Sequence, residues 1–266
     1  MIQLVLLAVM TLSVACLGQT TGVQKAIICL TYDDGLQSQL TTAIPQLDSA
    51  GLHGTFFLNS IEGSTEILGQ GSPALFGWRK ASQNGHELGN HTLFHPCLEK
   101  FGWQKEIALE GYSMDELLME IRLANSYLEQ IDRKKKQRSF AYPCNNTAIR
   151  GVDYSSKIRE LNLVRFARGG GDQSSLVSDL KTINFMQVPS WHVMQGTPLS
   201  ELIEFAEKVK KTNGLGIYQF HGIGGPLFEI SSQTHRDFLK YLKENDEYYS
   251  VLTFSEAMEL VEKQSR

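Results

Sequence analysis

The chain has 266 residues, 42% of them hydrophobic, and a formal net charge of −4 at pH 7. It can bury a full core, and no Pro/Ser-rich linker, charge block or repeat divides it, so we expect a single domain. The slight negative charge argues against nucleic-acid binding, and the basic run at residues 133–136 is interpreted as a solvated helix end.

Residues 1–18 are predicted to be a signal peptide. Residues 2–14 are apolar but too short to span a bilayer, and Ser13-Val-Ala15 suits signal peptidase. The usual positive start is missing, so a buried N-terminal strand is the alternative. Cys16 after Ala15 also resembles a bacterial lipoprotein cleavage site, although Ser13 stands where an aliphatic residue is usual. We expect export to the periplasm, outer surface or medium, a folded domain of residues 19–266 and no transmembrane span; a lipid anchor at Cys16 stays open.

Short apolar runs then alternate with amphipathic stretches along the whole chain. The clearest helix begins at Ser113, where Glu116 three residues later predicts a capping box. Such alternation of strands and helices implies a mainly parallel sheet. Strands are predicted at residues 26–32, 55–59, 86–90, 139–142, 163–167, 216–220 and 249–253, and helices at 36–50, 74–83, from 113 on, at 198–211, 234–243 and 255–263.

Polar residues follow several of these strands directly. Asp33 and Asp34 end the first strand, His91 and His95 follow the third, and His221 follows the strand at 216–220. In a closed parallel barrel such strand ends meet at one mouth. Two neutral imidazoles and one carboxylate suit a divalent ion, and a second carboxylate free of the ion is what is needed to deprotonate a water held there.

Each of these features has a plainer interpretation when it is taken alone. An Asp-Asp-Gly sequence is commonly a turn, and single histidines are commonly surface or satisfied core residues. Their combination at strand ends favours the metal site. The spacing of His91 and His95 also predicts one helical turn, which would point both rings the same way.

Five motifs resemble those of the NodB-homology polysaccharide deacetylases, carbohydrate esterase family four. They are residues 31–35 (Thr-Tyr-Asp-Asp-Gly), 91–96 (His-Thr-Leu-Phe-His-Pro), 140–144 (Phe-Ala-Tyr-Pro-Cys), 190–191 (Ser-Trp) and 220–222 (Phe-His-Gly). The first two are specific and the others progressively weaker. The resemblance runs from about residue 25 to the C-terminus, and it implies a distorted (β/α) barrel with about seven parallel strands in one domain.

The resemblance also implies roles for individual residues. Asp34, His91 and His95 would bind a divalent metal, with zinc as the default. Asp33 would be the general base and His221 the general acid. The backbone amide of Cys144 would help to stabilise the oxyanion. Tyr142 and Asn145 would line a sugar groove, and Trp191 would contact the acetyl methyl or a sugar face, with core packing as the alternative for Trp191.

The chain departs from the family pattern at two places. Many relatives carry an arginine where this chain has Ala141, and that arginine orients the catalytic aspartate. Arg165 and Arg168 are candidates to replace it, and Arg168, nearer the strand's C-terminal end, is the one we expect at the mouth. The fourth motif usually includes an aspartate that tunes the acid histidine; Asp179 is too far upstream to be a confident match, which leaves the tuning of His221 open.

Three cysteines remain in the expected mature chain. Cys29 lies in the first apolar run and is interpreted as a core residue. Cys97 and Cys144 each follow a motif proline, so a disulfide between them is conceivable in an exported protein, but spacing alone does not establish it.

The expected function is therefore removal of acetyl groups, N- or O-linked, from an oligo- or polysaccharide by an exported, metal-dependent hydrolase. Two alternatives stay open. One is a metal-independent amidohydrolase on the same fold, against which the joint retention of Asp34, His91 and His95 argues. The other is a catalytically silent carbohydrate-binding protein, which the degraded third and fourth motifs favour.

Overall fold

The structure, a computed structural model, describes residues 25–59 and 73–265. The predicted signal peptide and Cys16 lie outside these residues. Among the helices within them, none is long and apolar enough to cross a membrane.

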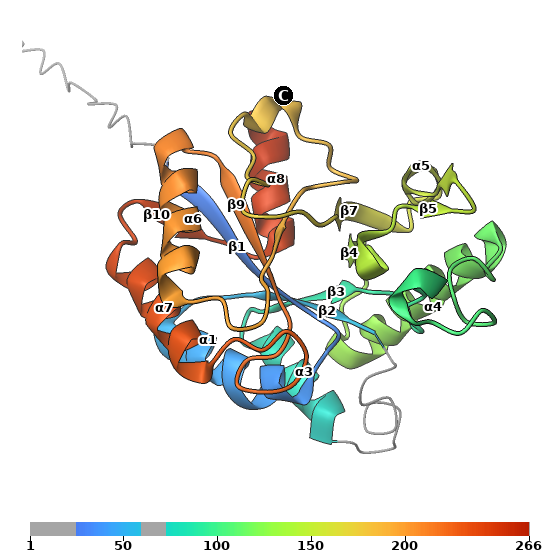
Figure 1. The fold of residues 1–266 in the computed structure, drawn as a ribbon, viewed down its shortest axis with the longest axis horizontal. Helices are drawn as coiled ribbons and strands as arrows, with labels where there is room; N and C mark the ends of the chain where they lie inside the picture. Colours follow the sequence, from blue (N-terminus) through green and yellow to red (C-terminus); the bar gives the residue numbers. More distant parts are fainter. Residues whose placement is uncertain (1–24, 60–72, 266) are drawn as a thin grey trace, which may run out of the picture.

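One curled parallel sheet organises the fold (Figure 1). Its seven-strand path runs β7-β4-β3-β2-β1-β9-β8, and β10 pairs with the first half of β1. Every pairing in this sheet is parallel, so the predicted distorted barrel of about seven parallel strands is confirmed. The strands are β1 (Ala26–Asp33), β2 (Thr55–Leu58), β3 (Glu87–Asn90), β4 (Arg138–Ala141), β7 (Val164–Arg168), β8 (Trp191–His192), β9 (Leu215–Phe220) and β10 (Tyr249–Val251). A separate small hairpin joins β5 (Ala148–Ile149) to β6 (Val152–Asp153).

The predicted helices are present in the predicted order. The helix expected at 36–50 begins as a π-helix, η1 (Gln39–Ala43), and continues as α1 (Ile44–Ala50), which ends at Gly51 with φ 65°. The capping box of α4 (Met114–Asp132) is present, with the Ser113 and Glu116 side chains each accepting from the other's backbone N–H. The remaining helices are α3 (Pro73–Gln83), α5 (Ser155–Glu160), α6 (Leu199–Thr212), α7 (Ser232–Glu244) and α8 (Phe254–Gln264), with short 3₁₀ turns η2 (Glu99–Phe101), η3 (Pro143–Asn145) and η4 (Leu180–Thr182).

Both faces of β1 are buried, and its alternate residues face two different layers. Ala26, Ile28, Leu30 and Tyr32 belong to the cluster formed with α1, α6 and α7, which lie side by side in Figure 1. Ile27 and Cys29 face the opposite way, into a cluster that includes the apolar side of α8. Because side chains alternate along a strand, Asp33 continues the second series. The strand therefore delivers Asp33 to the enclosed face of the sheet rather than to the helical layer.

Candidate active site

The carboxyl ends of neighbouring strands bring the predicted polar residues together. Asp33 and Asp34 come from the end of β1, His91 follows β3, and His221 follows β9. These four residues and His95 line one hollow of about 470 Å³. The wall is completed by Asn59, Phe101, Trp103, Cys144, Asn145, His192, Gln219, Leu227 and Phe228.

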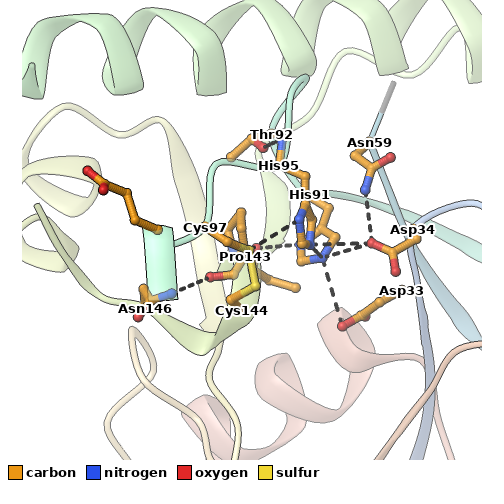
Figure 2. Close-up of a disulfide and its surroundings, with 12 residues drawn as sticks. Asp33, Asp34, Asn59, His91, Thr92, His95, Cys97, Pro143, Cys144 and Asn146 are labelled. Atoms are coloured by element: carbon orange, nitrogen blue, oxygen red, sulfur yellow. Dashed lines mark hydrogen bonds and ion pairs between the residues drawn. A yellow bond between two sulfur atoms is a disulfide. The ribbon is translucent and has the colours of Figure 1, made fainter. Parts of the chain in front are cut away.

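Three donor atoms converge in this hollow, as Figure 2 shows. His91 Nε2 lies 3.1 Å from His95 Nε2. Asp34 Oδ1 lies 3.6 Å from the first nitrogen and 3.4 Å from the second. Donors about 2.0–2.1 Å from a tetrahedral zinc ion are themselves roughly 3.4 Å apart, so the three atoms already have the spacing of one face of such a site.

The two histidines do not share a helical turn, so that prediction is wrong. Residues 91–98 contain no helix, and Thr92 and His95 adopt left-handed backbone conformations with φ 63° and 49°. The Thr92 hydroxyl accepts a hydrogen bond from the His95 N–H at 2.9 Å. This tight, irregular loop, rather than a helical turn, brings the His91 and His95 rings together edge to face, with their centroids 4.6 Å apart.

Neighbouring groups orient these donors. His91 Nδ1 lies 2.8 Å from the Ala141 carbonyl oxygen, which directs the lone pair of Nε2 into the hollow, and the Asn59 amide donates to Asp34 Oδ1 at 2.9 Å. Burial lowers the pKa of His91 to about 3, against the opposing charge of Asp33, and burial also lowers the pKa of His95. Both rings are therefore neutral at pH 7, the form that binds a metal, and the donor set fits a divalent ion.

The second carboxylate is held by an arginine. Arg168 Nη2 donates to Asp33 Oδ1 at 2.7 Å and to Oδ2 at 2.6 Å, and Gln219 Nε2 donates to Oδ2 at 3.0 Å. Burial by itself would raise the pKa of Asp33, but Arg168, with smaller contributions from His91 and His221, holds it at about 2. Asp33 is thus ionised at neutral pH although its side chain is buried.

The expected contact between Arg168 and the mouth is therefore present. Arg168 is fully buried at the end of β7, and its guanidinium lies over the Phe57 ring. It cannot touch a substrate directly, so its place is behind Asp33 rather than in a sugar groove. Arg165 points the other way and pairs with Glu259 on α8. Arg168 is the register partner of Ala141 on the neighbouring strand β4, so the guanidinium comes from the strand beside the position that the family pattern predicts.

His221 faces the same carboxylates from the other side. Its Nε2 lies 3.8 Å from Asp34 Oδ2, whereas its Nδ1 is buried with no hydrogen-bond partner among the described residues. Asp179 caps η4 at the surface and is not that partner. Burial lowers the pKa of His221 to about 4, partly opposed by the charge of Asp33. The ring is therefore neutral at pH 7 before any substrate binds.

A disulfide joins two loops of the site (Figure 2). Cys97 and Cys144 are bonded across 47 residues of sequence, with their Cα atoms 5.7 Å apart. The Cys97 sulfur lies 3.5 Å from His95 Nδ1. The bond ties the loop that carries His95 to the loop after β4, while Cys29 is a free cysteine in the core, as expected.

Known proteins resemble this chain in sequence and in fold. The family model described as polysaccharide deacetylase matches residues 20–158, just over half of the chain. The chain belongs to the polysaccharide deacetylase family. No curated protein sequence matches it.

Solved structures share the fold of this deacetylase-family chain at low sequence identity. An acetyl xylan esterase of family four from Clostridium thermocellum, solved with a cobalt ion, has 18% identity and a TM-score of 0.52, over 88% of this chain and 91% of its own. A family-four domain of a xylanase from the hindgut metagenome of Trinervitermes trinervoides has 17% identity and a TM-score of 0.53, over 88% and 90%. A family-four pseudoenzyme from Bacillus anthracis has 17% identity and a TM-score of 0.54, over 88% and 66%. At these identities the likeness shows the fold alone.

Two residues expected in the sugar groove of this family member are core residues instead. Tyr142 is 1% exposed, and its hydroxyl donates to the Met186 carbonyl oxygen at 2.7 Å. Trp191 is 4% exposed and packs on Phe205 and Tyr218, so core packing, the alternative for this residue, is what the structure contains. Neither ring lines the hollow that holds Asp33. Asn145 and Cys144 do line it.

The loops around the site hold unusual backbone conformations. Left-handed φ values are uncommon for residues other than glycine and gather where a site over-determines the local structure. Seven such residues carry or flank the hollow: Asp34, Thr92, His95, Cys144, Asn145, Leu227 and Phe228.

Several lining residues escaped the sequence analysis. Gln219 lies two positions before His221 on β9, and the alternation of a strand would have placed it on the enclosed face. His192 follows Trp191 at the end of β8, a two-residue strand that the sequence pattern does not predict, so no expected strand end marked this histidine. Asn59 and Trp103 lie in loops, where no local pattern predicts which way a side chain points.

Proposed function

We propose that this protein is a metal-dependent hydrolase that removes acetyl groups, N- or O-linked, from a carbohydrate. The observation that carries the proposal is the pairing of two carboxylates with different surroundings. Asp34 faces two neutral imidazoles at the spacing of metal donors, and Asp33 beside it is fixed and ionised by Arg168. Family membership and the fold shared with an acetyl xylan esterase that holds a cobalt ion support the same conclusion.

Asp34, His91 and His95 would hold the ion, most simply zinc, given one carboxylate and two imidazoles. When bound, a divalent ion polarises a carbonyl oxygen and makes water more acidic. Asp33 accepts a proton from the water that attacks the acetyl carbon. Arg168 and Gln219 keep its carboxylate charged and aimed into the hollow while it does so.

His221 then supplies the proton that the leaving group needs. The carbon–nitrogen or carbon–oxygen bond of the acetyl group breaks, and acetate and the free amine or hydroxyl are the products. Because the ring is neutral at rest, it takes up a proton from solvent as negative charge develops beside it and passes that proton to the leaving group, while Asp33 releases to solvent the proton it accepted from the water. The Cys144 backbone amide, in a loop that lines the hollow, is proposed to stabilise the oxyanion.

One observation favours a second candidate, a catalytically silent carbohydrate-binding protein. His221 Nδ1 has no carboxylate partner among the described residues, and a pseudoenzyme from Bacillus anthracis shares the fold. A pure binder has no use for a buried carboxylate held ionised by Arg168. The arrangement around Asp33 is therefore better explained by catalysis.

The test is acetate release from three substrate classes, namely chromogenic acetyl esters, chitooligosaccharides and acetylated xylan. Each is assayed with added zinc and with a chelator. We expect turnover of at least one class, loss of turnover with chelator, and recovery when zinc returns. His91→Ala and His95→Ala should each lose both bound metal and activity, because two ligands rarely hold a catalytic ion. Binding of an oligosaccharide without any acetate release would favour the silent carbohydrate-binding protein. Turnover that persists with chelator would favour the metal-independent amidohydrolase.

We also propose that the protein is exported. The apolar segment at residues 2–14 and the disulfide between Cys97 and Cys144 support this, because stable disulfides belong to oxidising compartments. Fractionation of cells expressing the full chain, with sequencing of the N-terminus of the exported form, tests it. Recovery of an uncleaved protein from the cytoplasm alone would contradict export.

A further inference from the structure

One carboxylate of helix α4 holds the loop that carries His91 and His95. The backbone N–H groups of Leu93 and Phe94 both donate to a single atom, Glu120 Oε1, at 3.0 and 2.7 Å. Helix α4 packs against β3, the strand that leads into this loop. Both N–H groups lie between the two histidines in the chain. Glu120 therefore fixes the part of the loop that sets the spacing of the two rings.

The start of the loop is tied to the same helix. Asn90 Oδ1 accepts a hydrogen bond from the Thr92 N–H at 2.8 Å, and the Asn90 amide donates to the Ile121 carbonyl oxygen and to Asn125 Oδ1, each at 2.8 Å. Thr92 and His95 hold left-handed backbone conformations, which cost free energy and persist only where the surrounding structure fixes them. Helix α4 supplies that surrounding structure.

Glu120 is buried where the pattern of its helix would favour an apolar residue. It is 5% exposed, whereas Met119 and Leu123 on the same helix are each 50% exposed. Glutamate is almost never buried without partners, and here the two loop N–H groups are partners of its carboxylate. A local reversal of the polar and apolar pattern is expected at positions that serve a functional site. The burial of Glu120 is therefore explained by the loop that it holds.

We propose that Glu120 is a positioning residue for the metal site. Within the described residues it does not line the hollow that contains Asp34, so it acts through the loop and not on a substrate. By fixing the loop it keeps His91 Nε2 and His95 Nε2 3.1 Å apart before an ion arrives. Donors that are already in place bind an ion more tightly, because less freedom is lost on binding. The inference rests on the proposed function, since it needs an ion between these donors.

Titration of the metal-free protein with Co²⁺ tests this role without turnover. The dissociation constant is obtained from the visible absorption of the bound ion. Glu120→Ala should bind Co²⁺ about 10–100-fold more weakly than the wild type, the range for losing a group that orients metal ligands. Glu120→Gln should recover most of this loss, because its amide oxygen can still accept both N–H groups.

Glu120→Asp keeps the test decisive even if Glu120→Ala does not fold. Aspartate keeps the carboxylate but withdraws its oxygens from the loop by one methylene, whereas glutamine keeps the reach and loses the carboxylate. Glu120→Gln should therefore bind Co²⁺ more tightly than Glu120→Asp. Equal or tighter binding by Glu120→Asp would overturn the proposal, because the position of the acceptor would then not matter.

Glu116 provides the matched control on the same helix. It lies one turn before Glu120, and its carboxylate accepts from the Ser113 N–H at 2.8 Å in the capping box. Glu116→Ala should lower the denaturation midpoint, because part of a helix cap is lost, but it should leave the Co²⁺ affinity unchanged. An equal fall of Co²⁺ affinity in Glu116→Ala and Glu120→Ala would show that metal binding only follows stability, and would overturn the positioning role.

Hydrogen exchange in the metal-free protein gives a second readout. The Leu93 and Phe94 amides should exchange faster in Glu120→Ala than in the wild type, because both lose their acceptor. Faster exchange with unchanged Co²⁺ affinity would overturn the positioning role. If the wild type binds no Co²⁺, the metal-dependent hydrolase and the positioning role both fail. If the wild type binds Co²⁺ and Glu120→Ala binds it equally well, only the positioning role fails.

Discussion

Arg168 shows how one side chain sets the chemistry of another. A buried carboxylate without a partner would be protonated at neutral pH and could not act as a base. The guanidinium at 2.6–2.7 Å reverses this for Asp33. Arg165, three positions earlier on the same strand, is 40% exposed in its side chain and pairs with Glu259 at the surface. Arg168 is therefore the position to test, and Arg165 is its matched control.

Arg168→Met should lower both stability and turnover. Removing one partner of a buried ion pair costs roughly 3–5 kcal/mol, because the other charge is left unpaired. Turnover should fall by about 10–100-fold, as when groups that orient a site are lost, while metal content stays unchanged. Arg165→Met should cost at most about 1 kcal/mol. Chemical denaturation, metal analysis and steady-state kinetics on both variants check this, and equal losses in the two would contradict it.

Asp33 and Asp34 should respond differently to the same substitution. Asp33→Asn should keep the metal and lose turnover by roughly 10²–10⁴, the range for a general base. Asp34→Asn should lose the metal, because it weakens the donor set of Asp34, His91 and His95. Metal analysis of both purified variants decides between the roles. Loss of metal in Asp33→Asn with retention in Asp34→Asn would reverse the assignment.

At the scale of elements, the site depends on the loops between strands. The loop after β3 carries His95, and the loop after β4 carries Cys144 and Asn145. Both loops contain residues in left-handed conformations, which an isolated segment would not keep. The disulfide holds them together, and it also contacts the ring of His95.

The double variant Cys97→Ser/Cys144→Ser should be less stable and should bind metal more weakly. A crosslink closing 47 residues stabilises the folded state by about 4 kcal/mol in the chain-entropy model. Metal affinity should fall because His95 loses its fixed neighbour. Thermal unfolding and metal titration measure both effects. A reductant should shift the wild type in the same direction and leave the double variant unchanged; a reductant effect of equal size in both would contradict this account.

At the scale of the whole molecule, buried neutral histidines link stability to pH. His235 on α7 is fully buried between the Tyr32 hydroxyl and the Gln46 side chain, each at 2.7 Å. Burial lowers its pKa to about 3, below the ordinary value near 6.5 that it regains on unfolding. Between these values the unfolded chain binds a proton that the folded chain does not. Stability is therefore lost as the pH falls below about 6.5.

Acidification from pH 6.5 to 4.5 should cost roughly 2 kcal/mol through His235 alone. His235→Gln should remove that part of the pH dependence, because glutamine can still accept from the Tyr32 hydroxyl but does not titrate. Unfolding free energies measured with chelator present at both pH values check this. A wild-type slope in His235→Gln would contradict the prediction.

The sequence by itself determined the parts of this protein that depend on neighbours along the chain. The alternation of strands and helices and the capping box of α4 are local signals, and the structure contains both of them. The residues Asp33, Asp34, His91 and His221 could be grouped because each follows a strand. The ends of parallel strands meet at one mouth whatever the details of packing.

Only the tertiary structure decided which side chains meet across strands. The contact of Arg168 with Asp33 and the bond between Cys97 and Cys144 both depend on the curl and register of the sheet. Tyr142 became a core residue for the same reason, because the hairpin and α5 segment packs over it. Local periodicity predicts on which face of a strand a side chain lies, but it does not predict which distant residue that side chain will contact.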